Sequence, residues 1–382
     1  MQWTEGAEQR SARWYAQNGT PPPRRVVPAD SRMGVAAAYR HVCEGTALLW
    51  RGDYQSARRL LTSLGRRAEG RGRSAPQAGA QAGSPGEAFH LQRREQARRT
   101  RILGLLLIPY ENGWTVALRG APEVSEACTH AYGPPAQGPG AGSLRELLGL
   151  VGAYEWHRKG VEIPALGPGG RIHPHYGVFS PVRGEYVDLV AEAPLPASAA
   201  TAFDLGTGTG VLAAVLARRG VRRVVATDLD PRAVACARDN AGRLGLSERI
   251  DVQEADLYPQ GRADLVVCNP PWLPARPRTA LDRAVYDPES RMLRGFLDGA
   301  ADHLLPGGEA WLVLSDLGER LGLRGRTELV DLIAAAGLRV LGRLDTAPRH
   351  PRATDRSDPL HEARSGEVTS LWRLGVEAPS GR

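Results

Sequence analysis

The residues best suited to chemistry follow an apolar run in the C-terminal half of the chain. Leu265 to Cys268 read as a buried strand, which stops at the tetrapeptide Asn269-Pro270-Pro271-Trp272. Because two consecutive prolines cannot continue a β-ladder, we expect Asn269 to stand at the end of this strand. Ligands of open α/β sheets bind at the carboxyl ends of the strands. The tetrapeptide is therefore the first candidate site.

The tetrapeptide offers acceptors for a nitrogen whose lone pair is delocalised into a π system. The Asn269 side-chain oxygen and the Pro270 carbonyl could each accept one N–H bond from such a group. These bonds would align the weakly nucleophilic nitrogen with an electrophile and favour the charge that develops on it. Trp272 could stack on the planar group. The alternative is a proline-rich loop in which Trp272 serves only for packing.

A glycine-rich segment precedes the tetrapeptide by about sixty residues. It reads Asp204-Leu205-Gly206-Thr207-Gly208-Thr209-Gly210 and joins a predicted strand to a predicted helix. Glycines at alternate positions permit a sharp turn and let a ligand lie against the backbone. A dinucleotide fingerprint would read G-x-G-x-x-G, whereas this segment reads G-x-G-x-G. Alone it is a weak signal, since glycine turns also join strands to helices for structural reasons.

Two acidic residues at the ends of the next strands make this signal more specific. Asp228 follows the glycines by about twenty residues, where a carboxylate can accept hydrogen bonds from a ribose diol. Asp256 ends the third predicted strand and could reach an adenine edge or its amine. Asp230 also lies near the second strand, but Pro231 after it indicates a helix N-cap. Each acid alone could be a surface residue.

From Thr201 onward, strand and helix patterns alternate, which predicts an α/β fold with a mostly parallel sheet covered on both faces. Asp287-Pro288 is a second N-cap signal, and Gly220 and Gly337 stand where left-handed C-caps belong. The predicted strands are Thr201 to Gly206, Arg223 to Asp228, Ile250 to Asp256, Ala263 to Cys268, Glu309 to Ser315, Leu338 to Asp345 and Glu367 to Leu374.

The first 170 residues lack a visible catalytic constellation. Residues 1–30 show no sustained period and predict a loosely ordered leader, followed by a helical hairpin up to residue 64. The predicted division is a helical region (1–64), a flexible Gly/Ala/Ser-rich linker (65–88), a small α+β accessory domain (89–170) and the α/β domain (171–382). Asn112-Gly113 between two apolar runs predicts a β-hairpin over Ile102 to Leu118.

The basic charge of the chain is concentrated at its N-terminus. Of a net charge of +7, residues 1–100 contribute seventeen arginines against eight acidic residues. This excess fits either a surface that binds RNA or another polyanion, or an arginine-rich arm that serves solubility. The sequence has no signal-peptide pattern and no apolar run long enough to span a membrane, so we expect a cytoplasmic protein without a membrane partner.

Two histidines precede the α/β region, in the segment Ile172-His173-Pro174-His175-Tyr176. Their spacing suits a metal, but the sequence offers no third ligand nearby. We therefore expect hydrogen-bonded histidines and no metal site. The four cysteines are widely separated, which indicates neither a disulfide framework nor a zinc knuckle.

In combination, the glycine segment, Asp228, Asp256 and the Asn269 tetrapeptide resemble class I S-adenosylmethionine-dependent methyltransferases of the small-domain branch. The resemblance covers roughly residues 172–375. It implies a seven-stranded Rossmann-like sheet that ends in an antiparallel hairpin. S-adenosylmethionine would be the cofactor, with Asn269, Pro270, Pro271 and Trp272 as catalytic residues. The implied cofactor contacts are Asp204, Gly206, Thr207, Gly208, Gly210, Asp228, Asp256, Asn269 and Phe179.

Within that branch, the segments Val178-Phe179-Ser180-Pro181 and Tyr286-Asp287-Pro288-Glu289 look most like the glutamine N5-methyltransferases that act on translation release factors. Trp272 stands where that group usually has tyrosine. The resemblance thus implies a protein substrate, such as a release factor or a ribosomal protein. The alternatives are an exocyclic amine of rRNA, tRNA or DNA, which the basic N-terminal part would suit, and a non-catalytic adaptor with a vestigial fold.

Overall fold

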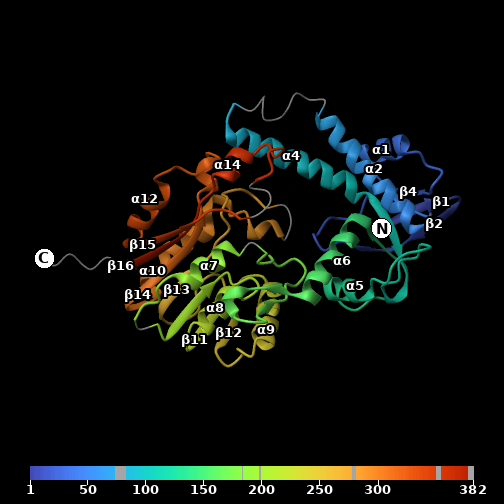
Figure 1. Cartoon of the computed structure of the whole chain (residues 1–382). Helices are drawn as coiled ribbons and strands as arrows, with labels where there is room; N and C mark the ends of the chain where they lie inside the picture. Colours follow the sequence, from blue (N-terminus) through green and yellow to red (C-terminus); the bar gives the residue numbers. More distant parts are fainter. Residues whose placement is uncertain (74–82, 183, 198, 278–280, 350–353, 377–382) are drawn as a thin grey trace. The chain divides into compact units, whose positions relative to one another are not determined.

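The structure is a computed structural model of the chain (Figure 1). It describes all residues except 74–82, 183, 198, 278–280, 350–353 and 377–382. The chain folds into two compact units. One holds residues 1–83 and 87–155, and the other holds residues 84–86 and 156–382. Each unit is described by itself.

The C-terminal unit is built on a seven-stranded sheet with the order β12-β11-β10-β13-β14-β16-β15. Its first five strands run parallel, and β16 is antiparallel to both β14 and β15. The expected mostly parallel sheet with an antiparallel last hairpin is therefore confirmed. The strands are β10 (Thr201–Leu205), β11 (Arg223–Asp228), β12 (Ile250–Glu254), β13 (Ala263–Cys268), β14 (Leu304–Ser315), β15 (Leu338–Thr346) and β16 (Thr369–Val376).

Helices cover both faces of this sheet, as expected for parallel strands. One face packs against α7 (Glu185–Glu192), α8 (Val211–Arg218) and α9 (Pro231–Arg243). The other packs against α10 (Arg291–His303) and α12 (Glu328–Ala335). The remaining elements of the unit are β8 (Val161–Glu162), η2 (Pro164–Leu166), β9 (Arg171–Ile172), η3 (Leu281–Ala284), η4 (Pro288–Ser290), α11 (Leu317–Arg320) and α14 (His361–Ser365).

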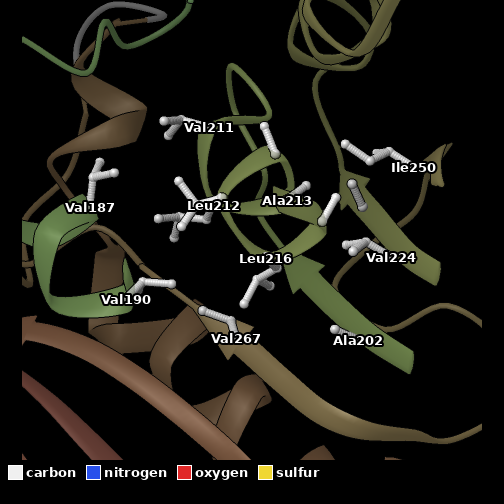
Figure 2. Close-up of a cluster of buried hydrophobic side chains, with 14 of the residues drawn as sticks. Val187, Val190, Ala202, Val211, Leu212, Ala213, Leu216, Val224, Ile250 and Val267 are labelled. Atoms are coloured by element: carbon white, nitrogen blue, oxygen red, sulfur yellow. The ribbon is translucent and has the colours of Figure 1, made fainter. Parts of the chain in front are cut away.

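The α8 helix is buried along its whole length except at its last residue, which explains its nearly uniform apolar sequence. Figure 2 shows Leu212 and Leu216 of this helix among valines of α7 and of the sheet strands. Burying side chains of this size contributes about 1.5 to 3 kcal/mol each. The glycine segment that precedes α8 is thus anchored to a rigid element.

The N-terminal unit contains a five-stranded sheet with the order β3-β7-β6-β5-β4 and a separate hairpin of β1 and β2. Its elements are β1 (Gln2–Glu5), β2 (Glu8–Ser11), β3 (Arg13–Tyr15), β4 (Arg25–Ala29), α1 (Val35–Cys43), β5 (Thr46–Trp50), α2 (Tyr54–Arg73), most of α4 (Pro85–Gly104), β6 (Leu106–Tyr110), η1 (Asn112–Trp114), α5 (Ser125–Tyr132), β7 (Gly140–Ser143) and most of α6 (Leu144–Lys159).

Three expectations for this unit were wrong. The leader is not loosely ordered, because four strands lie within residues 1–30. The helical hairpin is interrupted by β5, whose five residues are all buried. The hairpin over Ile102 to Leu118 is reduced to one isolated bridge between Tyr110 and Val116, because β6 pairs instead with β5 and β7.

The strands on either side of the predicted linker pair with each other, so residues 1–64 and 89–155 do not form separate domains. β5 and β6, which lie on either side of the linker in sequence, are hydrogen-bonded neighbours, so both stretches share one sheet. Residues 65–73 of the predicted linker continue α2, whereas residues 74–82 lie outside the described residues. Among the helices that the structure describes, none combines the length and the apolar character needed to cross a membrane.

Candidate active site

Strand register brings the candidate residues to one edge of the C-terminal sheet. Leu205 of β10 pairs with Cys268 of β13 and with Thr227 of β11. The next residues along these strands are Gly206, Asn269 and Asp228. Three segments that are far apart in sequence therefore end side by side at the carboxyl edge, where parallel sheets bind ligands.

The glycine segment turns sharply because its three glycines adopt left-handed backbone angles. The φ values are 69° at Gly206, 54° at Gly208 and 80° at Gly210, a region that side chains with a Cβ rarely adopt. A Cβ at Gly210 would lie 3.2 Å from Ala237, whereas one at Gly208 would meet nothing within 4 Å. The backbone is therefore tightly packed at Gly210 and open at Gly208.

Asp204 holds this turn from inside the protein. Its side chain is 1% exposed, and its Oδ2 atom accepts hydrogen bonds from Thr207 Oγ1 at 2.6 Å and from the Ala213 amide at 3.0 Å. Burial raises the pKa of Asp204 to about 6 and outweighs the opposing effect of these hydrogen bonds. Asp204 thus links β10 to both the turn and α8.

Asp228 connects the second strand to the same turn. Its Oδ2 atom accepts from the Gly208 amide at 3.0 Å, and its Oδ1 atom accepts from the Asp230 amide at 2.9 Å. Burial raises the pKa of Asp228, partly offset by these backbone donors. Since each carboxylate oxygen has a further lone pair, the group can still accept hydrogen bonds from a ligand. Asp230 caps α9 through the Arg232 amide, as predicted.

Asp256 follows the third strand, and the amide of the preceding Ala255 donates to the Asp228 carbonyl at 3.1 Å. β12 ends at Glu254, two residues earlier than predicted, and Asp256 is exposed. Its carboxylate forms an ion pair with Arg291 at the start of α10. The expected contact of Asp256 with an adenine edge stays a prediction.

The tetrapeptide leaves β13 as expected, and it contains a hydrogen bond that the sequence did not reveal. Trp272 Nε1 donates to Asn269 Oδ1 at 2.8 Å. Because an indole nitrogen can only donate, this bond fixes which end of the Asn269 amide faces the tryptophan. The carbonyl oxygen of an amide accepts two hydrogen bonds, so one lone pair of Oδ1 stays available. Trp272 is half-buried and packs against the apolar side chains on both faces of the C-terminal sheet.

Arg324 supports the tetrapeptide through its backbone and was not identified from the sequence. Its side chain is buried, with 5% exposed, and its Nη2 atom donates to the Trp272 carbonyl at 3.3 Å. Burial lowers the pKa of Arg324, while the charges of Glu319, Glu328 and Asp287 oppose that shift. The guanidinium therefore lies among carboxylates and fixes the backbone at Trp272.

The segment before α10 completes this edge. Asp287 accepts hydrogen bonds from the Met292 and Leu293 amides and thereby caps α10 across a short 3-10 turn. Within that turn, Glu289 and Ser290 adopt left-handed φ values of 58° and 54°. The Met292 methyl group lies over Gly206, so close that a Cβ on that glycine would collide with it. Met292 is a second neighbour that sequence reasoning missed.

A buried asparagine ties the segment before the sheet to the glycine turn. Asn240 on α9 is 1% exposed. Its side chain accepts from the His173 amide at 2.7 Å and donates to the carbonyls of His173 and Thr209. Val178 of the same segment packs on α9, and Phe179 after it is half-buried. The cofactor role expected for Phe179 stays a prediction.

Comparison with known proteins agrees with this geometry. Residues 169–320 match the family model described as the methyltransferase small domain. The release factor glutamine methyltransferase of Cereibacter sphaeroides is 36% identical over 173 residues, which are 41% of this chain and 60% of that protein. The ribosomal protein L11 methyltransferase of Tolumonas auensis is 33% identical over 122 residues, covering 31% and 42% of the two chains.

A third relative acts on RNA by name. The tRNA1(Val) (adenine(37)-N6)-methyltransferase of Shewanella loihica is 28% identical over 217 residues, covering 53% of this chain and 86% of that protein. The chain spans only 60% and 42% of the Cereibacter and Tolumonas relatives, respectively. The matched segment contains the glycine turn, Asp228 and Asn269. Residues 169–320 are thus similar to the methyltransferase small-domain family, and this segment is less than half of the chain.

Proposed function

We propose that this protein transfers a methyl group from S-adenosylmethionine to a planar nitrogen, with a protein glutamine side chain as the preferred acceptor. The single observation that carries the proposal is the position of Asn269. Its amide ends β13 directly beside the glycine turn that follows β10, and the Trp272 hydrogen bond fixes its orientation.

The residues at the sheet edge fit the cofactor that the family uses. Gly208 leaves open space against the backbone, and Asp228 can accept hydrogen bonds from a ribose diol. S-adenosylmethionine supplies an electrophilic methyl group when bound. Asp204, Gly206 and Thr207 would shape its binding site, because they form the turn itself.

The acceptor side of the reaction follows from the geometry of the tetrapeptide. The remaining lone pair of Asn269 Oδ1 and the Pro270 carbonyl would each accept an N–H bond of the substrate amide. These bonds orient the nitrogen and stabilise the positive charge that develops on it during transfer. The Trp272 ring offers an apolar face to the planar group. The bound nitrogen subsequently loses a proton to water.

Two observations bear on the choice of substrate. The Cereibacter relative is named for a release factor glutamine. The tetrapeptide of this chain also resembles that of the glutamine N5-methyltransferases, apart from its aromatic residue. The Shewanella relative is named for a tRNA adenine, whose exocyclic amine is also planar and would use the same two acceptors. The arginine excess in residues 1–100 favours this second candidate, because phosphate contacts dominate RNA affinity.

The two candidates are separated by labelling. A cell lysate is incubated with the protein and radioactive methyl donor and then treated with protease, RNase or DNase. Loss of counts only after protease is the expected result, and loss after RNase would assign the second candidate. The variant Asn269→Ala should abolish transfer and leave affinity for S-adenosylhomocysteine nearly unchanged. A fully active variant would place the acceptor site elsewhere.

A further inference from the structure

Three side chains with metal-binding atoms meet outside the candidate active site. His157 lies near the end of α6, His175 follows β9, and Asp239 lies on α9. All three belong to the C-terminal unit. The sequence predicted no metal site because His157 and Asp239 are distant from His175 along the chain. The fold supplies the two partners that the local pattern lacked.

The geometry of the three side chains is compact. One ligand atom from each residue lies within 4.8 Å of the other two. His175 Nε2 is 3.3 Å from Asp239 Oδ2, and the His157 and His175 rings lie edge to face with centroids 5.2 Å apart. Two imidazoles and one carboxylate form a common ligand set for zinc and for other divalent transition metals.

We propose that His157, His175 and Asp239 bind one divalent transition-metal ion, for which Zn²⁺ is the suitable probe. Ligand atoms about 2.0 to 2.1 Å from a tetrahedral zinc are about 3.3 Å apart, which is the present separation of His175 and Asp239. The wider separations close by rotation of side chains that are only partly buried. Three protein ligands leave the fourth position to water.

The neighbouring groups define the competing arrangement. Arg243 Nε donates to Asp239 Oδ2 at 2.9 Å, so the same residues without a metal form a histidine–carboxylate–arginine network. His173 lies outside this group of three, and its Nδ1 atom is 2.6 Å from the His157 carbonyl.

A metal here would have a structural consequence for the glycine turn. It would join the last residues of α6, which belong to the C-terminal unit, to the segment after β9 and to α9, at a point one residue from Asn240. Asn240 in turn bonds the His173 backbone and the Thr209 carbonyl. The ion would therefore hold this segment in the position that supports the turn.

The test uses the full chain after treatment with a chelator. Zn²⁺ is titrated by calorimetry, and Co²⁺ is followed by its visible absorption. We expect one ion per chain and a higher unfolding temperature with Zn²⁺. His175→Gln and Asp239→Asn should each weaken Zn²⁺ binding by at least about tenfold, a loss typical even of residues that only support a ligand. His173→Gln is the matched control and should keep the affinity.

The unfolding temperatures of the variants in chelator show whether a substitution weakens Zn²⁺ binding itself or destabilises the fold. Each variant in chelator gives its own metal-free reference, because Asp239→Asn also removes the ion pair with Arg243. Relative to that reference, the rise caused by Zn²⁺ should disappear in both variants. The proposal is overturned if the wild type binds no Zn²⁺, if both ligand variants bind it as tightly as the wild type, or if His173→Gln weakens binding as much as they do. Any of these results would leave the histidine–carboxylate–arginine network as the account of the cluster.

Discussion

Replacing Trp272 by phenylalanine tests whether the indole N–H orients the catalytic amide. The substitution keeps an aromatic face and removes the donor that bonds Asn269 Oδ1 at 2.8 Å. Without that bond, the Asn269 amide can turn its NH₂ group toward the acceptor nitrogen, which would repel the substrate N–H. Trp272→Phe should therefore slow methyl transfer, with little effect on cofactor affinity.

The magnitude follows from the type of hydrogen bond. A neutral bond contributes about 0.5 to 1.5 kcal/mol, and Asn269 is only partly buried, so water can replace part of the loss. A cost of about 1 kcal/mol corresponds to a roughly fivefold lower kcat. Trp272→Ala removes the ring as well and should also raise KM for the acceptor.

The assay measures kcat and the KM for the acceptor at saturating S-adenosylmethionine. The acceptor is the lysate fraction that the labelling experiment identifies as methylated. A roughly fivefold fall in kcat with an unchanged KM in Trp272→Phe supports the orienting role. A variant faster than the wild type would refute it, because the indole would then compete with the substrate for Oδ1. Unchanged kinetics in both variants would reduce Trp272 to a packing residue.

Two further predictions concern stability. Burial raises the pKa of Asp204 from 3.8 to about 6, so the wild type should lose stability relative to Asp204→Asn as the pH rises from about 4 to 7, by about 3 kcal/mol. The unfolding temperatures of both proteins across this pH range measure the loss, and a difference that does not change with pH would contradict the prediction. Glu289→Gly should be about 1 kcal/mol more stable than Glu289→Ala, because only glycine adopts the φ of 58° at this position without backbone strain. Denaturant unfolding measures the difference, and equal stabilities would show that the position is not strained.

The C-terminal fold could be predicted from sequence because its signals are local. β13 was recognised as an apolar run ended by prolines, and all six of its residues are buried. The Asp230 cap and the left-handed glycines at positions 220 and 337 were also predicted and are confirmed. Such signals depend only on neighbouring residues, so they can be read without knowledge of the tertiary structure.

The N-terminal unit was harder to predict because several of its strands lack the alternation of apolar and polar residues that marks a strand in a sequence. β2 is exposed at all four residues, and β7 reads Gly-Ala-Gly-Ser, so neither shows an apolar alternation. Their pairing depends on partners far along the chain. The first two strands of the five-stranded sheet, β3 and β7, are separated by more than a hundred residues.

The candidate site shows the same division. The glycine turn, Asp228 and Asn269 were predicted, because each follows a recognisable strand. Asn240 and Arg324 were not, because their roles arise only when α9 and the segment after α11 pack against distant backbone. Long-range hydrogen bonds of this kind leave no mark in a single sequence.

The central claim, that the carboxyl edge of the sheet binds the methyl donor, is tested most directly by calorimetric titration with S-adenosylhomocysteine. The wild type should bind one molecule per chain. Asp228→Asn should bind about 10- to 150-fold more weakly, since hydrogen bonds to a charged acceptor contribute about 1.5 to 3 kcal/mol. Absence of binding by the folded wild type, or equal affinity in the variant, would contradict the claim.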